Sequence, residues 1–505
     1  MKSLIGGCSA QRQRIPAHLA LLLLLLPIAG SVCAQVPDAT ANAATAITAT
    51  SVAASDPAPA AGSSSDCSTN FFGRLAAAYR EDANPAPADP NTPAPARRGL
   101  DAPFSSPPFP SAEWQLGGMD YPIGVPNENA QYPLEKALAC TSLGRWMQDN
   151  RIETYGWINP SMNISSSNFN NYPLSYATRP NRVEFNQFLL RVERLPDTVQ
   201  TDHIDWGFHF DNLYGYDYHY TTMKGVFSNQ LLNNPNPNQP IAANAGTAGK
   251  VYGDDPMIWY AELYIPWVAQ GMAITAGRYL SLPDIEAQFA PQNYLLTHSI
   301  LYTVDAYTNV GILTTTKLND QWTLQLGLHG GDDSAPWNST SRLSLQACVQ
   351  WKSASNNDML YPCVESYNNK NQTYNNLQEF VVTWGHRFSP NVHMLTEAYR
   401  IYVLNAPGYP AGQDAAYGAV NYFNVELNPT NMISIRNEWV NDQVGQRTGY
   451  ATRYISNTVG LTHWATPDIE LRPEIRYEHS LDVAAYDEGK KKHQATALFD
   501  VIFHF

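Results

Sequence analysis

The final stretch of the chain, residues 494–505, constrains the fold more than any other part of the sequence. Successive side chains of a β-strand point to opposite faces, so residues two apart share a face. One face of this strand is apolar and carries Ala495, Ala497, Phe499, Val501, Phe503 and Phe505. Because the sequence ends there on an aromatic residue, we expect lipid rather than a further protein layer to cover that face. The alternative is an edge strand of a soluble β-sandwich.

The charge balance argues against a nucleic-acid partner. The chain carries 45 Asp and Glu against 31 Lys and Arg, whereas binding to phosphates requires a basic surface. Charged residues make up only 15% of the sequence, and Tyr and Trp are abundant. Transmembrane β-barrels place such aromatic residues in girdles at the two membrane interfaces. The composition is therefore typical of a membrane barrel.

The first 34 residues have the pattern of a secretory signal peptide. Three basic residues precede the apolar run 19–26, and a compact, small-residue stretch ending at Ala34 suits cleavage. Beyond this segment, no apolar run approaches the roughly 18 residues that a membrane-spanning helix needs. If the chain spans a membrane, we expect a closed barrel, because open strand edges leave backbone groups unpaired in hydrocarbon.

Three further regions follow the predicted signal peptide. Residues 35–110 are a low-complexity leader rich in Ala, Thr, Ser and Pro, with a short helix predicted near 67–82. Residues 111–150 are a connecting segment. From residue 151 to 505 the pattern of polar and apolar residues changes. Here we predict an all-β domain, a transmembrane antiparallel up-and-down β-barrel.

The predicted barrel rests on segments of about ten residues that alternate in polarity, as tilted transmembrane strands do. Short turns such as 389–391, 428–430 and 466–468 alternate with longer connections such as 280–306 and 403–417. This alternation is typical of the periplasmic turns and external loops of barrels. We predict about 16 strands, at 152–159, 183–194, 203–214, 257–266, 271–279, 307–317, 321–330, 342–352, 358–367, 377–388, 392–402, 418–427, 432–441, 453–464, 468–478 and 494–505.

Several of these strands carry a face that cannot contact lipid. A midplane arginine on the lipid side costs about 2–4 kcal/mol, so the charged face must line a water-filled interior. Arg278 and Arg400 share the parity of apolar neighbours, so either they lie at the barrel rims or the register slips there. The predicted pore-lining residues are Asp205, His209, Asp211, Glu262, Arg436, Glu438, Arg472, Glu474, Arg476 and Glu478.

Four cysteines follow the predicted signal peptide. If 353–357 is a turn, Cys348 and Cys363 lie opposite each other on adjacent strands. Opposed Cβ atoms are about 4.5–5.5 Å apart, a little beyond the bonded range, so local adjustment would allow a disulfide on the inner wall. Two free thiols are the alternative. Pairing of Cys67 with Cys140 is allowed by the sequence and not required by it.

The connection 280–306 is unusually apolar for a loop in water. We therefore hypothesise that it folds into the barrel and narrows it. In that arrangement Asp284 and Glu286 would face Arg472, Arg476 or similar basic wall residues. The alternative is a loop packed on the outer rim.

No motif in the sequence points to an enzyme or to a cofactor. The nucleophile elbow, the zinc-protease helix motif and the P-loop are all missing. His298 and Ser299 are adjacent, and adjacent side chains on an extended segment point apart. His329, Asp332 and Asp333 lie at a Gly-Gly turn and have the chemistry to bind a cation, although such clusters are more often solvated loops. We expect no metal and no cofactor.

Five short motifs of the predicted barrel resemble the OmpL-like β-barrel porins of Gram-negative outer membranes, a resemblance that covers roughly 150–505. The motifs are 183–188, 260–266, 277–279, 309–311 and 396–399. The resemblance implies an outer-membrane pore without an established substrate. We predict, as our own interpretation, a porin for passive diffusion of small hydrophilic solutes. The resemblance does not assign a function to any residue of this chain.

The alternative to an open pore is a plugged or structural barrel with a surface-binding role, in which residues 111–150 thread inside. The expected partners of either form are outer-membrane lipid and lipopolysaccharide, the barrel-assembly machinery acting through the C-terminal strand, and other copies of the chain in a homo-oligomer. The leader at 35–110 is then expected in the periplasm.

Overall fold

The structure is a computed structural model, and its described residues are 67, 69–84, 97–100, 113–114, 116–119, 121–127, 131–231, 250–368 and 377–505. The predicted signal peptide, 1–34, and most of the leader lie outside the described residues. The short helix expected near 67–82 is present as α1 (Phe71–Asp82). It begins after Asn70, whose side chain accepts a hydrogen bond from the Gly73 amide at 2.9 Å and so caps the helix.

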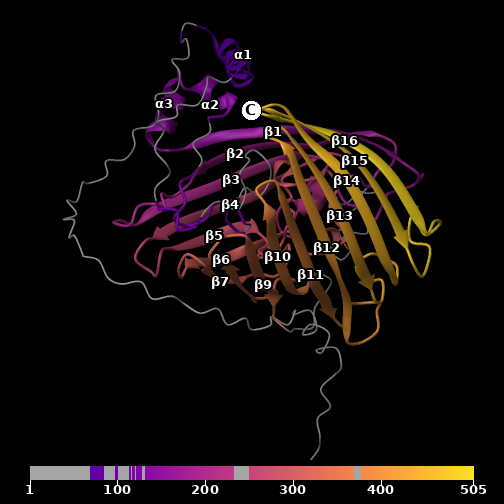
Figure 1. Cartoon of the computed structure of the whole chain (residues 1–505). Helices are drawn as coiled ribbons and strands as arrows, with labels where there is room; N and C mark the ends of the chain where they lie inside the picture. The colour runs from indigo at the N-terminus through magenta and orange to yellow at the C-terminus, as the bar shows by residue number, and fades with distance from the viewer. Residues whose placement is uncertain are drawn as a thin grey trace, which may run out of the picture. The chain divides into compact units, whose positions relative to one another are not determined.

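Sixteen antiparallel strands form one closed barrel in sequence order, with β1 paired to β16 (Figure 1). The predicted fold and strand number are therefore confirmed. The strands are β1 (Glu153–Ser165), β2 (Val183–Arg194), β3 (Asp205–Gly215), β4 (Gly253–Ile265), β5 (Met272–Leu280), β6 (Thr308–Lys317), β7 (Trp322–His329), β8 (Ser344–Lys352), β9 (Asp358–Tyr367), β10 (Gln378–Ser389), β11 (Val392–Leu404), β12 (Gln413–Asn428), β13 (Asn431–Asp442), β14 (Thr452–Thr466), β15 (Ile469–Ser480) and β16 (His493–His504).

The C-terminal strand closes the barrel, and its register with β1 runs from Trp157 opposite His504 to Ser165 opposite Thr496. Closure removes the free edges that a sheet in hydrocarbon could not satisfy. The chain therefore enters and leaves the barrel at one end, which we call the terminal mouth. The opposite end, where β5 finishes at Leu280, is the far mouth.

The two faces of each strand differ as the sequence pattern requires. In β15, Ile475 is 69% exposed on the outer face, whereas its neighbours Glu474 and Arg476 are buried on the inner face. The same alternation places Trp206 outside and Asp205 inside on β3. Apolar side chains thus face the position of lipid, and charged side chains face the interior.

The connections at the terminal mouth are short, and those at the far mouth are long. The far connections hold the short helices α4 (Tyr218–Thr221), η2 (Ser228–Leu231), η4 (Ala290–Gln292) and α5 (Ile300–Val304). Arg278 and Arg400 both lie near this mouth. Arg278 is buried and bonded to Asp255 at 2.8 Å, and Arg400 is exposed on the outer face. Their parity therefore reflects a rim position.

Helices α1, α2 (Pro133–Leu138) and α3 (Ser142–Asp149) lie at the terminal mouth. The Tyr79 hydroxyl of α1 donates to the His504 carbonyl at 2.8 Å, and the Thr154 amide of β1 donates to Glu135 of α2 at 2.9 Å. A disulfide joins Cys67 to Cys140 and so ties α1 to the α2–α3 connection. Within the described parts of the chain, no helix is long and apolar enough to cross a membrane.

A second disulfide lies in the barrel wall. Cys348 of β8 and Cys363 of β9 are paired directly opposite each other, with their Cα atoms 4.2 Å apart. Both side chains are buried on the inner face. Cα atoms of ordinary opposed pairs are roughly 4.5–5.5 Å apart, so the closer approach here is the local adjustment that the bond requires.

Candidate functional site: the barrel interior

The inner wall is a network of paired charges. Buried charges are tolerated in proteins when each has an opposite charge and further hydrogen bonds nearby. Here the buried arginines of the wall each meet at least one carboxylate. The pairs are Arg191–Asp211 (2.9 Å), Arg194–Asp205 (3.0 Å), Arg278–Asp255 (2.8 Å), Arg436–Glu286 (3.1 Å), Arg472–Asp500 (2.5 Å) and Arg476–Glu438 (2.9 Å).

The predicted pore-lining side chains all lie buried on this inner face. His209 lies between Glu193 at 3.0 Å and Asp211 at 2.8 Å. Glu262 accepts a hydrogen bond from the Thr275 hydroxyl at 3.0 Å. Glu478 lies 2.7 Å from Arg476, which also pairs with Glu438 at 2.9 Å. Alternation within single strands was a sufficient signal for these residues, and it was equally present for Arg191 in β2, which the sequence prediction missed.

The connection between β5 and β6, residues 281–307, folds into the barrel, and we call it the interior loop. Its apolar side chains Leu282, Phe289 and Leu295 are buried. The wall holds its tip: Arg472 of β15 donates to the carbonyls of Ala290 and Asn293, at 2.8 Å each. The loop is therefore fixed to the wall through its backbone.

Further wall groups hold the rest of the interior loop. Arg436 of β13 pairs with Glu286, and the Tyr422 hydroxyl donates to the same carboxylate at 2.5 Å. Glu438 accepts from the Ile300 amide at 2.6 Å, and Glu474 accepts from the Thr297 amide at 3.0 Å. Charged groups thus bind the loop along much of its length.

Asp284 and Glu286 of the interior loop differ in their partners. Glu286 pairs with Arg436, one of the basic wall residues. Asp284 faces no wall arginine: it accepts from the Ser281 hydroxyl at 2.5 Å and lies beside Asp305. Arg472 and Arg476 already have wall carboxylates as partners, and their remaining N–H groups bind loop carbonyls, so neither needs a loop carboxylate.

A second part of the wall, on β10 and β11, is acidic. Its carboxylates accept hydrogen bonds from neutral groups: Glu379 from the Ala306 amide at 3.2 Å, and Glu397 from the Thr383 hydroxyl at 2.8 Å. Asp305 of the interior loop faces the same region and accepts from the Tyr399 hydroxyl at 3.0 Å. We call Asp284, Asp305, Glu379 and Glu397 the acidic wall. The prediction from sequence did not include it as a group.

The described residues 113–114, 116–119 and 121–127 lie against the inner face of the barrel, and we call this part of the chain the threaded segment. The Trp114 indole is buried, donates to the Asn356 carbonyl at 3.1 Å, and covers Gly385, where a side chain would overlap it. The Tyr121 hydroxyl donates to Glu262, and Ile123 packs on the wall of β4 and β5. Of the connecting segment 111–150, this part lies inside, whereas α2 and α3 lie at the terminal mouth.

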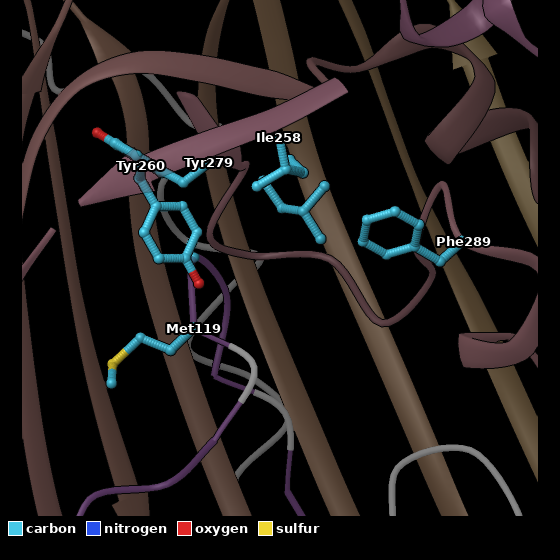
Figure 2. A pocket seen from close by; sticks show the side chains of 7 residues that line it. Met119, Ile258, Tyr260, Tyr279 and Phe289 are labelled. Atoms are coloured by element: carbon cyan, nitrogen blue, oxygen red, sulfur yellow. The ribbon is translucent and has the colours of Figure 1, made fainter. Parts of the chain in front are cut away.

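The threaded segment and the interior loop meet inside the barrel. The backbone of Gly117 lies so close to the Leu282 carbonyl that a Cβ would overlap it, and Gly118 has a φ of +71°, which favours glycine. Figure 2 shows the adjoining pocket, with Met119 of the threaded segment, Tyr260 of the wall and Phe289 of the interior loop around it. This pocket has a volume of about 10 Å³, which is about the space that one water molecule needs.

The candidate catalytic and metal-binding residues have structural roles. The Ser299 hydroxyl accepts from the Tyr302 amide at 3.0 Å and caps α5, while His298 bonds the Ala287 carbonyl at 2.8 Å. Asp333 accepts from the Thr308 amide at 3.0 Å, and burial raises the pKa of its carboxyl to about 6. Among the described residues, no group of three or more His, Cys, Asp or Glu side chains is placed to hold a metal ion.

Comparisons with solved structures give proteins of low sequence identity that are described as a channel, a porin and an outer membrane protein. The outer membrane channel DcaP of Acinetobacter baumannii is 10% identical, covers 70% of this chain and 97% of its own, and has a TM-score of 0.44. An anion-selective porin from Comamonas acidovorans is 7% identical, with 70% and 99% coverage and a TM-score of 0.43. OmpT of Vibrio cholerae, described as a trimer form, is 8% identical, with 70% and 99% coverage and a TM-score of 0.43.

The family comparison is more specific. Among curated proteins none matches the chain. The model of the family described as "Putative beta-barrel porin-2, OmpL-like" matches residues 151–505, which is the barrel with the two residues that precede β1. Family and fold indicate a channel rather than an enzyme. The chain belongs to the OmpL-like β-barrel porins and is a porin of the bacterial outer membrane.

Proposed function

We propose that this porin carries small hydrophilic solutes by passive diffusion, and that the interior loop sets the width of their path. The observation that supports this most is the attachment of the loop backbone to charged wall residues, above all to Arg472. A loop held in this way keeps a fixed position across the lumen.

The size and lining of the barrel support a water-filled path. Sixteen strands enclose more space than wall side chains alone can fill. The inner face carries both charge signs, and such groups favour water and polar solutes over apolar ones. The ten predicted pore-lining residues are buried, and five of them bond the interior loop, so we propose that they and the acidic wall set the electrostatic potential of the path that solutes follow.

The acidic wall favours cations among the charged solutes. The wall arginines are balanced by wall or loop carboxylates, as in Arg472–Asp500 and Arg476–Glu438. The carboxylates of the acidic wall instead accept hydrogen bonds from neutral donors, as Glu397 does from Thr383. Rings or clusters of carboxylates select cations in channels. We therefore propose a modest preference for cationic over anionic solutes.

The outer surface supports the proposed partners. Large apolar side chains such as Trp206, Ile312 and Ile475 are exposed on the outer face, where lipid would cover them. The apolar outer face of β16 offers the barrel-assembly machinery the same terminal Phe503 and Phe505 that end the sequence. Lipopolysaccharide at the far mouth and a homo-oligomer remain proposals to be tested by extraction and native mass measurements.

Deletion of residues 284–296 tests the role of the interior loop. All proteins compared carry a Gly-Ser stretch of equal length in place of residues 113–127, which otherwise fill part of the lumen. They are recorded in planar bilayers, and a larger single-channel conductance is expected from the deletion variant. A variant shortened at 407–411 in a far-mouth connection serves as the control, because Gly408 has open space around it. Equal conductance of all three proteins would rule out a constriction by the interior loop.

A further inference from the structure

We propose that the threaded segment is a removable plug: it closes the terminal half of the lumen in the state described here, and its withdrawal opens the channel. The inference rests on the proposed channel function. It goes beyond that function because it assigns an autoinhibitory role to a segment outside the family match, which begins at residue 151.

The position of the threaded segment supports closure. Its residues contact the inner faces of five strands, β4 to β7 and β10, through Tyr121 on Glu262, the Gly117 carbonyl on Gln325, and Trp114 over Gly385. On its other side it contacts the interior loop. The loop narrows the lumen from one side, and the segment fills part of what the loop leaves. Figure 2 shows one small pocket between them, beside Met119.

The path of the chain makes withdrawal feasible without unthreading. On one side of the segment, Arg97 donates to the carbonyls of Thr198 and Gln270, at 2.8 Å each, in the turns of the terminal mouth. On the other side, the chain continues into α2 at the same mouth. Both ends of the described segment also lie at this mouth. Trp114 donates to the Asn356 carbonyl at 3.1 Å, and Asn127 donates to the Pro196 carbonyl at 3.2 Å. The segment can therefore leave the lumen as a bend, with no chain end passing through the barrel.

The wall is complete without the segment. Glu262 keeps its hydrogen bond from Thr275 at 3.0 Å, and the Gln325 side-chain amide keeps its bond to the Thr315 hydroxyl at 3.0 Å. No described residue of the segment belongs to a β-strand, so no sheet hydrogen bonds break when it moves. A structural filler that the barrel required would be expected to share the sheet or to be the sole partner of buried wall groups.

The segment also remains tethered when it withdraws. The Cys67–Cys140 disulfide closes a loop of sequence separation 73 that contains it. Helix α1 is held at the mouth by the bond from Tyr79 to His504. The segment therefore stays linked to the terminal mouth on both sides, through α1 and through α2, so that it can return.

The test compares the full chain with an unplugged variant, in which a flexible Gly-Ser stretch of equal length replaces residues 113–127. A milder variant combines Trp114→Ala with Tyr121→Phe, so that the result does not depend on the folding of a single variant. The control is Trp146→Ala, because Trp146 is a 55% exposed tryptophan of α3 outside the barrel. Correct folding is checked by circular dichroism and by the heat-dependent gel mobility of each refolded protein.

Mean conductance in planar bilayers in potassium chloride is the readout. We expect the unplugged variant to conduct at least about tenfold more than the full chain, the milder variant to lie between them, and Trp146→Ala to match the full chain; tenfold corresponds to about 1.4 kcal/mol. Equal conductance of the full chain and the unplugged variant would overturn the plug and leave the channel function standing. Silence of every folded variant would instead overturn the channel function itself.

Discussion

Replacement of Arg472 by methionine tests how the interior loop is held. The guanidinium makes two kinds of contact: it pairs with Asp500 at 3.0 and 2.5 Å, and it donates to the carbonyls of Ala290 and Asn293, at 2.8 Å each. Methionine has a similar length and flexibility and no charge. The substitution therefore removes both kinds of contact while it keeps most of the packed volume.

The expected loss of stability follows from the burial of the pair. Both side chains of the Arg472–Asp500 pair are almost fully buried. Removal of one partner of such a pair costs about 3–5 kcal/mol, because the remaining charge stays buried. Asn159 still donates to Asp500 at 2.8 Å and offsets part of that loss. A buried loop carbonyl without a hydrogen-bond donor would cost about 1–3 kcal/mol. The loop is therefore expected to shift so that water can donate to these carbonyls.

A cycle of variants separates the two kinds of contact. Asp500→Asn breaks the ion pair and leaves the bonds from Arg472 to the loop, whereas the double variant removes both charges. Guanidinium unfolding in detergent micelles should show a loss of about 3–5 kcal/mol for Arg472→Met and a smaller loss for the double variant. In the unplugged variant, conductance should rise with Arg472→Met and with the double variant only. An equal rise with Asp500→Asn alone would refute anchoring through the loop carbonyls.

Three further predictions follow from other parts of the molecule. Cys348→Ser should lower the free energy of unfolding by about 3 kcal/mol, as expected for a short disulfide loop, and leave conductance unchanged; guanidinium titrations and bilayer recordings check this. Glu379→Gln with Glu397→Gln in the unplugged variant should move the reversal potential in a salt gradient toward anion preference. Burial raises the pKa of Glu135 from its ordinary value of 4.5 to about 7. The free energy of unfolding should therefore fall as the pH rises from about 4.5 through 7. Unfolding of Glu135→Gln over that range should lack this decline.

The barrel was predictable from sequence because lipid and water impose opposite demands on neighbouring residues. In β15, Ile475 and Arg476 each have one acceptable side of the wall, so a shift of one residue would place a charge in lipid. The predicted strands 183–194 and 358–367 match β2 and β9 to the residue. Strand ends were less exact in β12, where regular pairing extends beyond the clear polarity pattern.

The interior arrangement was less predictable because it depends on contacts between distant parts of the sequence. Trp114 lies over Gly385, and nothing in the sequence around either residue predicts that the two are in contact. The threaded segment has neither the period of a strand nor that of a helix. The partner of Glu286 was predicted only as a basic wall residue for a related reason: several wall arginines have the right parity, and only the path of the loop selects Arg436.

The contacts of the two interior elements imply an order in which they release. The interior loop is held by several charge-assisted hydrogen bonds from Arg436, Arg472 and Arg476, whereas the threaded segment relies on the bond from Tyr121 to Glu262 and on neutral contacts. Charge-assisted bonds are about twice as strong as neutral ones. Urea should therefore release the threaded segment first. Conductance of the full chain should rise in two steps as urea increases, and that of the unplugged variant in one; a single step in both would mean that loop and segment release together.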